Sequence, residues 1–234
     1  MPTLILVRHG RTKANADGVL AGRSPGVRLD QVGRKQAAEV AARLAPVPLA
    51  TLVTSPLART VATAQAIIDV QQQPPPLLRA KGIIECGYGD WTGQSIKALA
   101  KQPMWKTVQN QPSAAVFPGG ESLLDMQHRA VSTVRAIDVE VEGEHGEACW
   151  VAVSHGDVIK AILADALGMH LDAFQRLVVH PASVSVVRYT ATRPMVLYVN
   201  DGGSDLSALR ASPKRRRRGK PSGDAVVGGG DGSL

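Results

Sequence analysis

Short apolar runs alternate with helical patterns along the first 200 residues. The runs with the length and β-branched content of buried strands are at 4–7, 49–54 and 148–154. Helical patterns cover residues 29–44, 57–70, 122–139 and 158–167. Two further strand-like runs close the series at 184–189 and 195–199. This repetition of strand and helix predicts an α/β fold with a mostly parallel, doubly wound sheet.

Breakers and polar stretches separate these segments. Residues 12–28 are polar and rich in glycine, so we expect a long loop there, and such loops are often functional. Ser55-Pro56 predicts the start of a helix, with the serine as N-cap and the proline in the first turn. From residue 201 the pattern gives way to Gly, Ser, Asp and a basic run. We therefore expect one domain at 1–200 and a disordered basic tail at 201–234.

Two of the predicted strands end in a histidine that is followed by glycine. The first runs into Arg8-His9-Gly10, and the third runs into Ser154-His155-Gly156. Parallel strands would deliver both imidazoles to the same edge of the sheet, where open α/β sheets bind ligands. A histidine there can serve as a nucleophile, as an acid or base, or as a ligand. An Arg–His pair at a strand end can also be exposed by chance.

Two arginines belong to the same predicted edge. Arg8 precedes the first histidine, and Arg59 lies in the first turn of the helix after the second strand. A guanidinium holds a phosphate or carboxylate with two parallel hydrogen bonds. The helix that begins after His155 adds backbone N–H groups that favour an anion. Two arginines and two histidines at one edge therefore predict a site for a dianion, and phosphate is the natural candidate.

Composition narrows the class of ligand. The 234 residues have a formal net charge of +7, but residues 201–234 hold seven Lys or Arg and four Asp and account for +3 of it. The remaining +4 suits an anionic small molecule and is no nucleic-acid footprint by itself. Aromatic residues make up 3% of the chain, which leaves little for stacking single-stranded bases. We therefore expect a small-molecule substrate and no nucleic-acid partner, and we interpret the basic run at 214–218 as a solvated tail.

Cysteine content and the first apolar run bear on the compartment. Cys86 and Cys149 are too few for a disulfide framework or a cysteine-built zinc site, which indicates a reducing compartment. Arg8 stops the first apolar run well short of the length of a signal peptide or a membrane span. We expect a cytoplasmic protein that does not associate with a membrane.

Five sequence blocks carry a family resemblance. They are Leu6-Val7-Arg8-His9-Gly10 with Thr12 and Asn15, Ser55-Pro56-Leu57-Ala58-Arg59-Thr60, Glu85-Cys86-Gly87-Tyr88-Gly89-Asp90-Trp91-Thr92-Gly93, Phe117-Pro118-Gly119-Gly120-Glu121-Ser122 and Val153-Ser154-His155-Gly156. In this order they resemble the histidine phosphatase superfamily, which includes the cofactor-dependent phosphoglycerate mutases. Arg-His-Gly alone is a weak signal, whereas five blocks in order are specific. The resemblance implies a three-layer α/β/α sandwich of the phosphoglycerate mutase type.

The resemblance also implies a role for each matching position. His9 would be the nucleophile that takes the phosphoryl group, and Glu85 would give a proton to the leaving oxygen. The positions implied to hold the phosphoryl oxygens or the substrate are Arg8, Arg59, His155, Asn15, Arg23 and Gly156. Such donors stabilise the transferring group without a metal ion or a cofactor. The implied reaction is hydrolysis of a phosphomonoester through a phosphohistidine, with Glu85 returning as the base for water.

Physical chemistry adds one expectation about the nucleophile. A nucleophilic histidine must present a neutral ring nitrogen, so a backbone carbonyl near Gly10 could hold the other N–H of His9. Residues in two of the other blocks also have purely structural interpretations. Glu121 could simply cap the helix that follows it, and we interpret Tyr88 and Trp91 as loop packing rather than as substrate contacts.

A phosphomutase of the phosphoglycerate mutase type is the alternative function. Mutases of the superfamily carry a long insertion before the Pro-Gly-Gly-Glu-Ser block, which protects the phosphoenzyme from water. Only residues 94–116 lie there in this chain. Arg11 stands where the mutases usually have an acidic residue, and the loop at 22–29 departs from the mutase pattern at the aspartate and proline positions. These three differences favour a phosphatase that acts on a small phosphorylated metabolite.

Two other points stay open in the sequence. A non-catalytic module that binds phosphorylated ligands is a third hypothesis, disfavoured because all five chemical positions hold competent residues. Members of the superfamily are often dimers or tetramers, so the resemblance is compatible with a homo-oligomer.

Overall fold

A six-stranded sheet forms the centre of the computed structural model, which describes residues 1–203 and 228. The strands are β1 (Thr3–Arg8), β2 (Leu49–Thr54), β3 (Leu77–Arg79), β4 (Cys149–Ser154), β5 (Val184–Tyr189) and β6 (Pro194–Asp201). Their order is β3-β2-β4-β1-β5-β6. The first four in this order are parallel, and β5 and β6 join antiparallel. The predicted mostly parallel sheet is confirmed.

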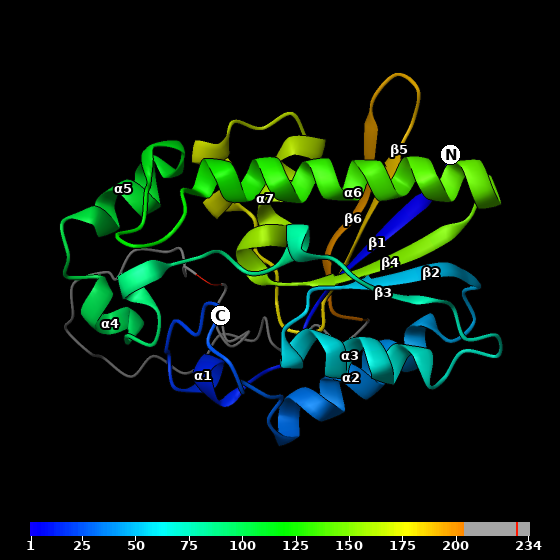
Figure 1. The fold of residues 1–234 in the computed structure, drawn as a ribbon, viewed down its shortest axis with the longest axis horizontal. Helices are drawn as coiled ribbons and strands as arrows, with labels where there is room; N and C mark the ends of the chain where they lie inside the picture. Colours follow the sequence, from blue (N-terminus) through cyan, green and yellow to red (C-terminus); the bar gives the residue numbers. More distant parts are fainter. Residues whose placement is uncertain (204–227, 229–234) are drawn as a thin grey trace, which may run out of the picture.

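Helices cover both faces of the sheet. The long helices are α2 (Gln31–Leu44), α3 (Ala58–Ile68), α6 (Leu123–His145) and α7 (Gly156–Ala166). Figure 1 shows α6 and α7 on one side of the sheet and α2 and α3 on the other. Successive side chains of β1 point to opposite faces of the sheet. Leu4 and Leu6 therefore pack in the apolar cluster of α6 and α7, whereas Ile5 and Val7 pack in that of α2 and α3. The predicted three-layer α/β/α sandwich is therefore confirmed.

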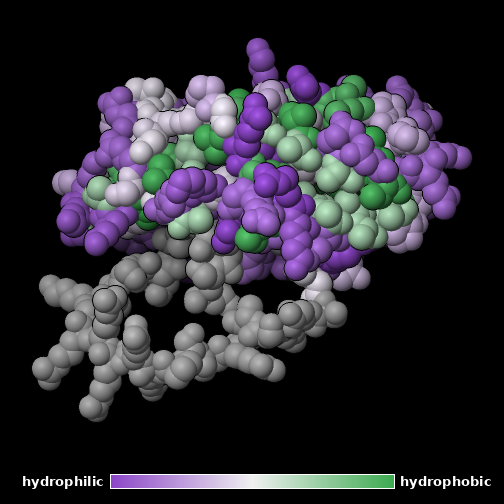
Figure 2. Space-filling model, turned by 90° about the horizontal axis from the view of Figure 1, so that it is seen from below, coloured by the Kyte–Doolittle hydropathy of each residue, from purple (hydrophilic) through white to green (hydrophobic). Residues whose placement is uncertain are grey.

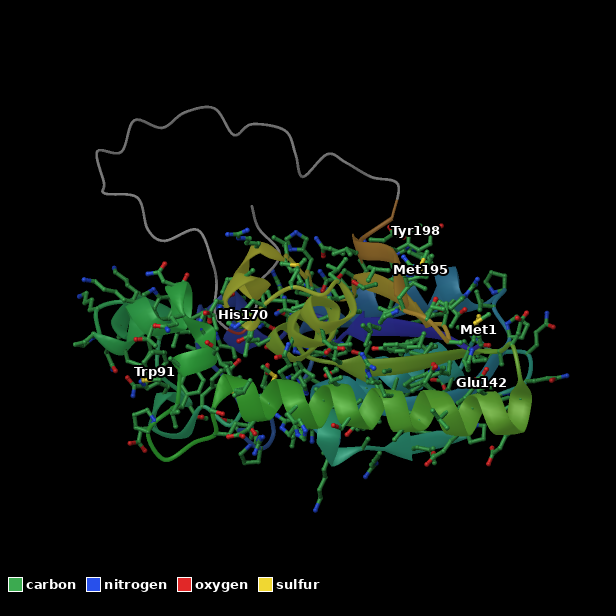
Figure 3. All side chains as sticks on the ribbon, turned by 90° about the horizontal axis from the view of Figure 1, so that it is seen from above. Met1, Trp91, Glu142, His170, Met195 and Tyr198 are labelled. Carbon is green, nitrogen blue, oxygen red and sulfur yellow. The ribbon has the colours of Figure 1, made fainter. Side chains whose placement is uncertain are left out.

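Among the described residues, three short helices and four 3-10 turns lie in the loops that connect the strands and the long helices. They are the helices α1 (Lys13–Ala16), α4 (Ile96–Leu99) and α5 (Met104–Asn110) and the 3-10 turns η1 (Lys81–Ile83), η2 (Gly89–Trp91), η3 (Pro112–Ala114) and η4 (Leu171–Arg176). In Figure 3, Trp91 of η2 lies at the opposite end of the molecule from Met1 and Glu142. Trp91 and Tyr88 are buried, and both pack edge-on against the ring of Phe117. The packing role predicted for these two aromatic residues is confirmed.

The predicted cap at Ser55 is wrong, and the alternative interpretation of Glu121 as a cap is not supported. Helix α3 begins at Ala58 with Leu57 at its N-cap and no side-chain cap bond, so Ser55 does not cap it. Helix α6 is capped by Ser122, whose side chain accepts a hydrogen bond from the Asp125 N–H, so Glu121 is not its cap. The Ser55 hydroxyl instead contacts the ring of His155, and the Glu121 carboxylate accepts hydrogen bonds from Arg23 and Arg129.

The surface and the chain ends complete the picture. Seen from the side on which α2 and α3 lie, polar side chains surround scattered apolar patches (Figure 2). The edge strand β6 leaves Met195 and Tyr198 exposed (Figure 3). No helix among the described residues has the length and apolar character needed to cross a membrane. Most of the predicted tail lies outside the described residues, and its disorder stays a prediction.

Candidate active site

The two strand-end histidines lie side by side. Strands β1 and β4 are parallel neighbours with Arg8 opposite Ser154, and the His9 N–H donates to the carbonyl of Ser154 at 3.0 Å. The next residue of each strand is therefore delivered to the same place. The rings of His9 and His155 are buried, with centroids 5.3 Å apart and planes at 61°.

The hydrogen bonds of His9 define its tautomer. Nδ1 lies 2.7 Å from the carbonyl oxygen of Gly10, and because a carbonyl only accepts, Nδ1 carries the proton. Nε2 then keeps its lone pair and accepts a hydrogen bond from Nε of Arg59 at 3.3 Å. Burial, followed by the charges of Arg59 and Arg8, holds the pKa of His9 well below its usual value. The ring is neutral at physiological pH and has one nitrogen able to attack.

The turn at Gly10 depends on close approach of two helices. A Cβ at Gly10 would collide with the carbonyl oxygen of Gly33 in α2, so no other residue fits there without moving the helix. On the other side, Gly10 N–H donates to the Thr63 hydroxyl of α3 at 3.1 Å. The carbonyl that fixes the His9 tautomer is thus itself fixed by α2 and α3.

The ring of His155 is held by the serine that precedes α3. Its Nε2 lies 2.7 Å from Oγ of Ser55, and Ser55 is placed by its own N–H, which donates to the carbonyl of Val153 in β4 at 3.0 Å. Nδ1 of His155 is buried, has no hydrogen-bond partner among the described residues and lies 3.9 Å from Oε2 of Glu85. Burial, then the charge of Arg59, lowers the pKa of His155 well below its usual value.

Both predicted arginines are buried at the site. Arg59 donates from Nη2 to the carbonyl of Gly22 at 2.8 Å, and its Nη1 has no hydrogen-bond partner among the described residues. Arg8 donates from Nη1 to the carbonyl of Val179 at 2.7 Å and from Nη2 to that of Gly228 at 3.3 Å. Burial lowers the pKa of Arg59 and lowers that of Arg8 to about 10. Both guanidinium groups keep their charge at neutral pH and can stabilise a phosphoryl dianion.

Glu85 is an acid that keeps its proton unusually well. It follows η1 in a loop, is 4% exposed, and accepts a hydrogen bond at Oε1 from the N–H of Cys86 at 2.9 Å. Burial and then the charge of Asp157 raise its pKa to about 7, against the opposing charges of Arg59 and Arg8. At neutral pH a large fraction of Glu85 is therefore protonated and able to donate.

Asp157 is a residue beside the site that sequence reasoning missed. Asp157 is the second residue of α7 and fully buried, and its Oδ2 accepts hydrogen bonds from the Tyr88 hydroxyl at 2.7 Å and from the Gly228 N–H at 2.9 Å. The ammonium of Lys160 lies 3.7 Å from its other oxygen. Asp157 directly follows the His-Gly pair in the chain, which was the available signal. Its burial was not visible in the sequence.

The three predicted substrate-binding residues lie at different places. Gly156 opens α7 beside His155, where the first N–H groups of a helix lack intrahelical partners. Asn15 lies in α1, and its Oδ1 accepts hydrogen bonds from the Thr12 N–H and hydroxyl at 3.0 and 2.8 Å. Arg23 donates to the Glu85 carbonyl and to Glu121. The substrate-binding role of all three stays a prediction.

The arrangement suits one class of chemistry. Two guanidinium groups, a neutral imidazole with an unprotonated Nε2 and a carboxyl that is partly protonated at neutral pH surround the strand edge, and this set of groups suits phosphoryl transfer to a histidine. Within residues 1–203 and 228, no three His, Cys, Asp or Glu side chains gather as metal ligands would.

Comparison with known proteins places the chain in a family. Residues 4–202 match the sequence model of the histidine phosphatase superfamily (branch 1), and the chain belongs to this superfamily. It is 31% identical over 203 residues to phosphoserine phosphatase 1 of Hydrogenobacter thermophilus, covering 86% of this chain and 92% of the relative. It is also 31% identical over 194 residues to the probable phosphoglycerate mutase GpmB of Yersinia enterocolitica, covering 81% and 86% of the two chains.

A solved structure agrees with this assignment. The fold superposes on that of Bacillus stearothermophilus YhfR with a TM-score of 0.78 and 26% sequence identity, covering 86% of this chain and 98% of the other. The predicted family and the phosphoglycerate mutase-like fold are both confirmed.

Proposed function

We propose that this protein hydrolyses phosphomonoesters of small metabolites through a covalent phosphohistidine on His9, without a metal ion or cofactor. The observation that carries this proposal is the tautomer of His9. Its proton sits on Nδ1, against the Gly10 carbonyl, so that Nε2 keeps an unprotonated lone pair, which accepts a long hydrogen bond of 3.3 Å from Nε of Arg59. A nitrogen held next to a buried cation is placed to attack a phosphate that the same cation binds.

In the first step, His9 Nε2 attacks phosphorus and the ester P–O bond breaks. The proton of Glu85 passes to the leaving oxygen, which would otherwise depart as an alkoxide. Arg8 and Arg59 stabilise the charge on the equatorial oxygens, and His155 together with the N–H groups at Gly156 adds further donors. Asn15 and Arg23 contact the substrate in this proposal.

In the second step, water attacks the phosphohistidine. The Glu85 carboxylate takes a proton from that water, the P–N bond breaks, and inorganic phosphate leaves with His9 neutral again. The pKa of about 7 for Glu85 suits both steps, because the residue must lose and regain a proton in each turnover.

A phosphomutase is the second candidate, and the similarity to a probable phosphoglycerate mutase favours it. Against it stands the short segment before the Pro-Gly-Gly-Glu-Ser block. That segment forms α4, α5 and η3, and its Leu99 and Val108 are buried in the core. Residues committed to the core add little to a cover that would shield the phosphoenzyme from water.

The test uses p-nitrophenyl phosphate and 3-phosphoglycerate. We expect the native protein to release phosphate from p-nitrophenyl phosphate in the presence of EDTA and to give a phosphohistidine at residue 9 on rapid alkaline quenching. His9→Ala should reduce turnover by about 10⁴-fold or more, the scale of losing a covalent nucleophile. Unchanged hydrolysis by His9→Ala would refute the mechanism. Isomerisation of 3-phosphoglycerate without release of phosphate would favour the mutase.

A further inference from the structure

The main-chain carbonyl of Glu85 accepts hydrogen bonds from two arginines that lie in distant parts of the sequence. Nε of Arg23 donates to the Glu85 carbonyl oxygen at 2.8 Å, and Nη2 of Arg129 donates to the same oxygen at 3.2 Å. Nη1 of Arg129 donates to the carbonyl of Gly82 at 2.6 Å. The guanidinium of Arg129, on α6, thus binds carbonyls at both ends of the turn that precedes Glu85. The guanidinium of Arg23, in the loop between α1 and α2, binds the second of these carbonyls as well.

The carboxylate of Glu121 ties the two arginines together. Its Oε1 accepts from Nη2 of Arg23 at 2.7 Å, from Nη2 of Arg129 at 2.6 Å and from the N–H of Gly87 at 2.8 Å. Its Oε2 accepts from Nε of Arg129 at 3.1 Å. Burial raises the pKa of Glu121, but the bonds from Arg129 and Gly87 outweigh burial and hold the pKa below its usual value. Glu121 is therefore a carboxylate at neutral pH, bound to residues on both sides of Glu85.

A loop residue needs such a network more than a strand residue does. Glu85 lies between η1 and η2 and has no ladder partner among the strands of residues 1–203. A general acid must nevertheless stay within hydrogen-bond reach of the leaving oxygen, and a displacement of 1 Å costs roughly 10²-fold in rate. Charge-assisted bonds to backbone carbonyls are strong and directional enough to hold it.

We propose that Glu121, Arg129 and Arg23 form a positioning network that holds the Glu85 carboxyl at the leaving-group oxygen. The network acts through the backbone at 82–87 and does not touch the reacting atoms. This inference rests on the proposed function, because it assigns the network to the acid of that reaction. It also gives the Glu of the Pro-Gly-Gly-Glu-Ser block a role that capping does not explain.

The choice of leaving group separates positioning from general structural support. p-Nitrophenolate leaves readily without a proton, whereas an alkoxide does not, so only the alkyl ester depends strongly on the acid. The value of kcat/KM reports the steps up to phosphoryl transfer, and comparing two esters isolates the contribution of Glu85. A variant that is merely less folded loses both activities in the same proportion.

The experiment compares Arg129→Lys with the matched control Arg135→Lys. Arg135 lies on the same helix and pairs with Asp165 at 2.9 Å, away from Glu85. A lysine cannot reproduce the fork that reaches two carbonyls and both Glu121 oxygens. We expect Arg129→Lys to lose about 10- to 100-fold in kcat/KM on glycerol 2-phosphate and less than about threefold on p-nitrophenyl phosphate, with Arg135→Lys unchanged on both.

A double-mutant cycle completes the test. Once Glu85→Gln has removed the acid, adding Arg129→Lys should cause no further loss on glycerol 2-phosphate. Equal losses on the two esters, or a full additional loss in the double variant, would overturn the inference. If Arg129→Lys does not fold, Glu121→Gln is assayed on the same two esters, and the same ratio of losses is expected. A native protein that hydrolyses neither ester would instead count against the proposed function.

Discussion

The strand-end histidines and the Glu85 loop reach the same site by different means. His9 and His155 are placed by the parallel ladder of β1 and β4, in which backbone hydrogen bonds fix the register. Glu85 pairs with no strand among the described residues, and its carbonyl oxygen accepts hydrogen bonds from the side chains of Arg23 and Arg129. Backbone register survives most substitutions, whereas a side-chain network fails when one member changes. The strand-end side of the site, with His9 and His155, should therefore tolerate nearby substitutions better than the Glu85 side.

Removing the acid itself should produce the largest difference between the two regions. Glu85→Gln keeps the size of the side chain but cannot donate the proton, so we expect kcat/KM on glycerol 2-phosphate to fall by about 10²- to 10⁴-fold. The loss on p-nitrophenyl phosphate should be much smaller, because its leaving group needs no proton. Glu142→Gln is the control, since Glu142 is half exposed and pairs with the Met1 ammonium. A loss that is equal on both esters would contradict the role of Glu85.

The second prediction, of intermediate size, concerns how kcat/KM depends on pH. Because the pKa of Glu85 is raised to about 7 and the donating form is the protonated one, kcat/KM on an alkyl phosphate should decline as the pH rises through about 7. Asp157 is the second cause of that raised pKa, so Asp157→Asn should lower it and move the decline to lower pH.

Comparison of the parent with the variant on one ester cancels the ionisation of the substrate. Asp165→Asn, on the same helix and paired with Arg135, should leave the profile in place. A decline that moves to higher pH in Asp157→Asn would contradict this electrostatic account.

The smallest effect should come from the strand-end side. Ser55→Ala removes the hydroxyl that lies 2.7 Å from Nε2 of His155 but leaves the ladder intact. A typical hydrogen bond contributes about 1 kcal/mol, so we expect a loss of up to roughly tenfold in kcat/KM and about 1 kcal/mol in the free energy of unfolding. The two esters should lose alike, because in the proposed mechanism His155 holds the phosphoryl group and not the leaving oxygen. Steady-state kinetics and urea unfolding measure both quantities, and a loss confined to the alkyl ester would contradict the assignment.

Several parts of the structure could be predicted because their signals are local. The buried strands at β1, β2 and β4 are continuous apolar runs, and the His-Gly pairs mark where two of them end. Strand β3 escaped prediction because it has three residues and only one strand neighbour. Helix α6 runs to His145, beyond the predicted end at 139, because Val141 continues its buried face among glutamates.

The sequence by itself determined the mostly parallel sheet and the strand edge at which His9, His155, Arg8 and Arg59 meet. These follow from apolar periodicity and from the fixed geometry of parallel strands, both of which act over a few residues. The three layers and the place of Glu85 were expected only from the family resemblance. Only the tertiary structure decided that Ser55 serves His155, that Asp157 is buried near Glu85, and that Arg23 and Arg129 converge on one carbonyl. These contacts join residues 44 to 100 positions apart or depend on burial, and burial and long-range contact are properties of the packed chain.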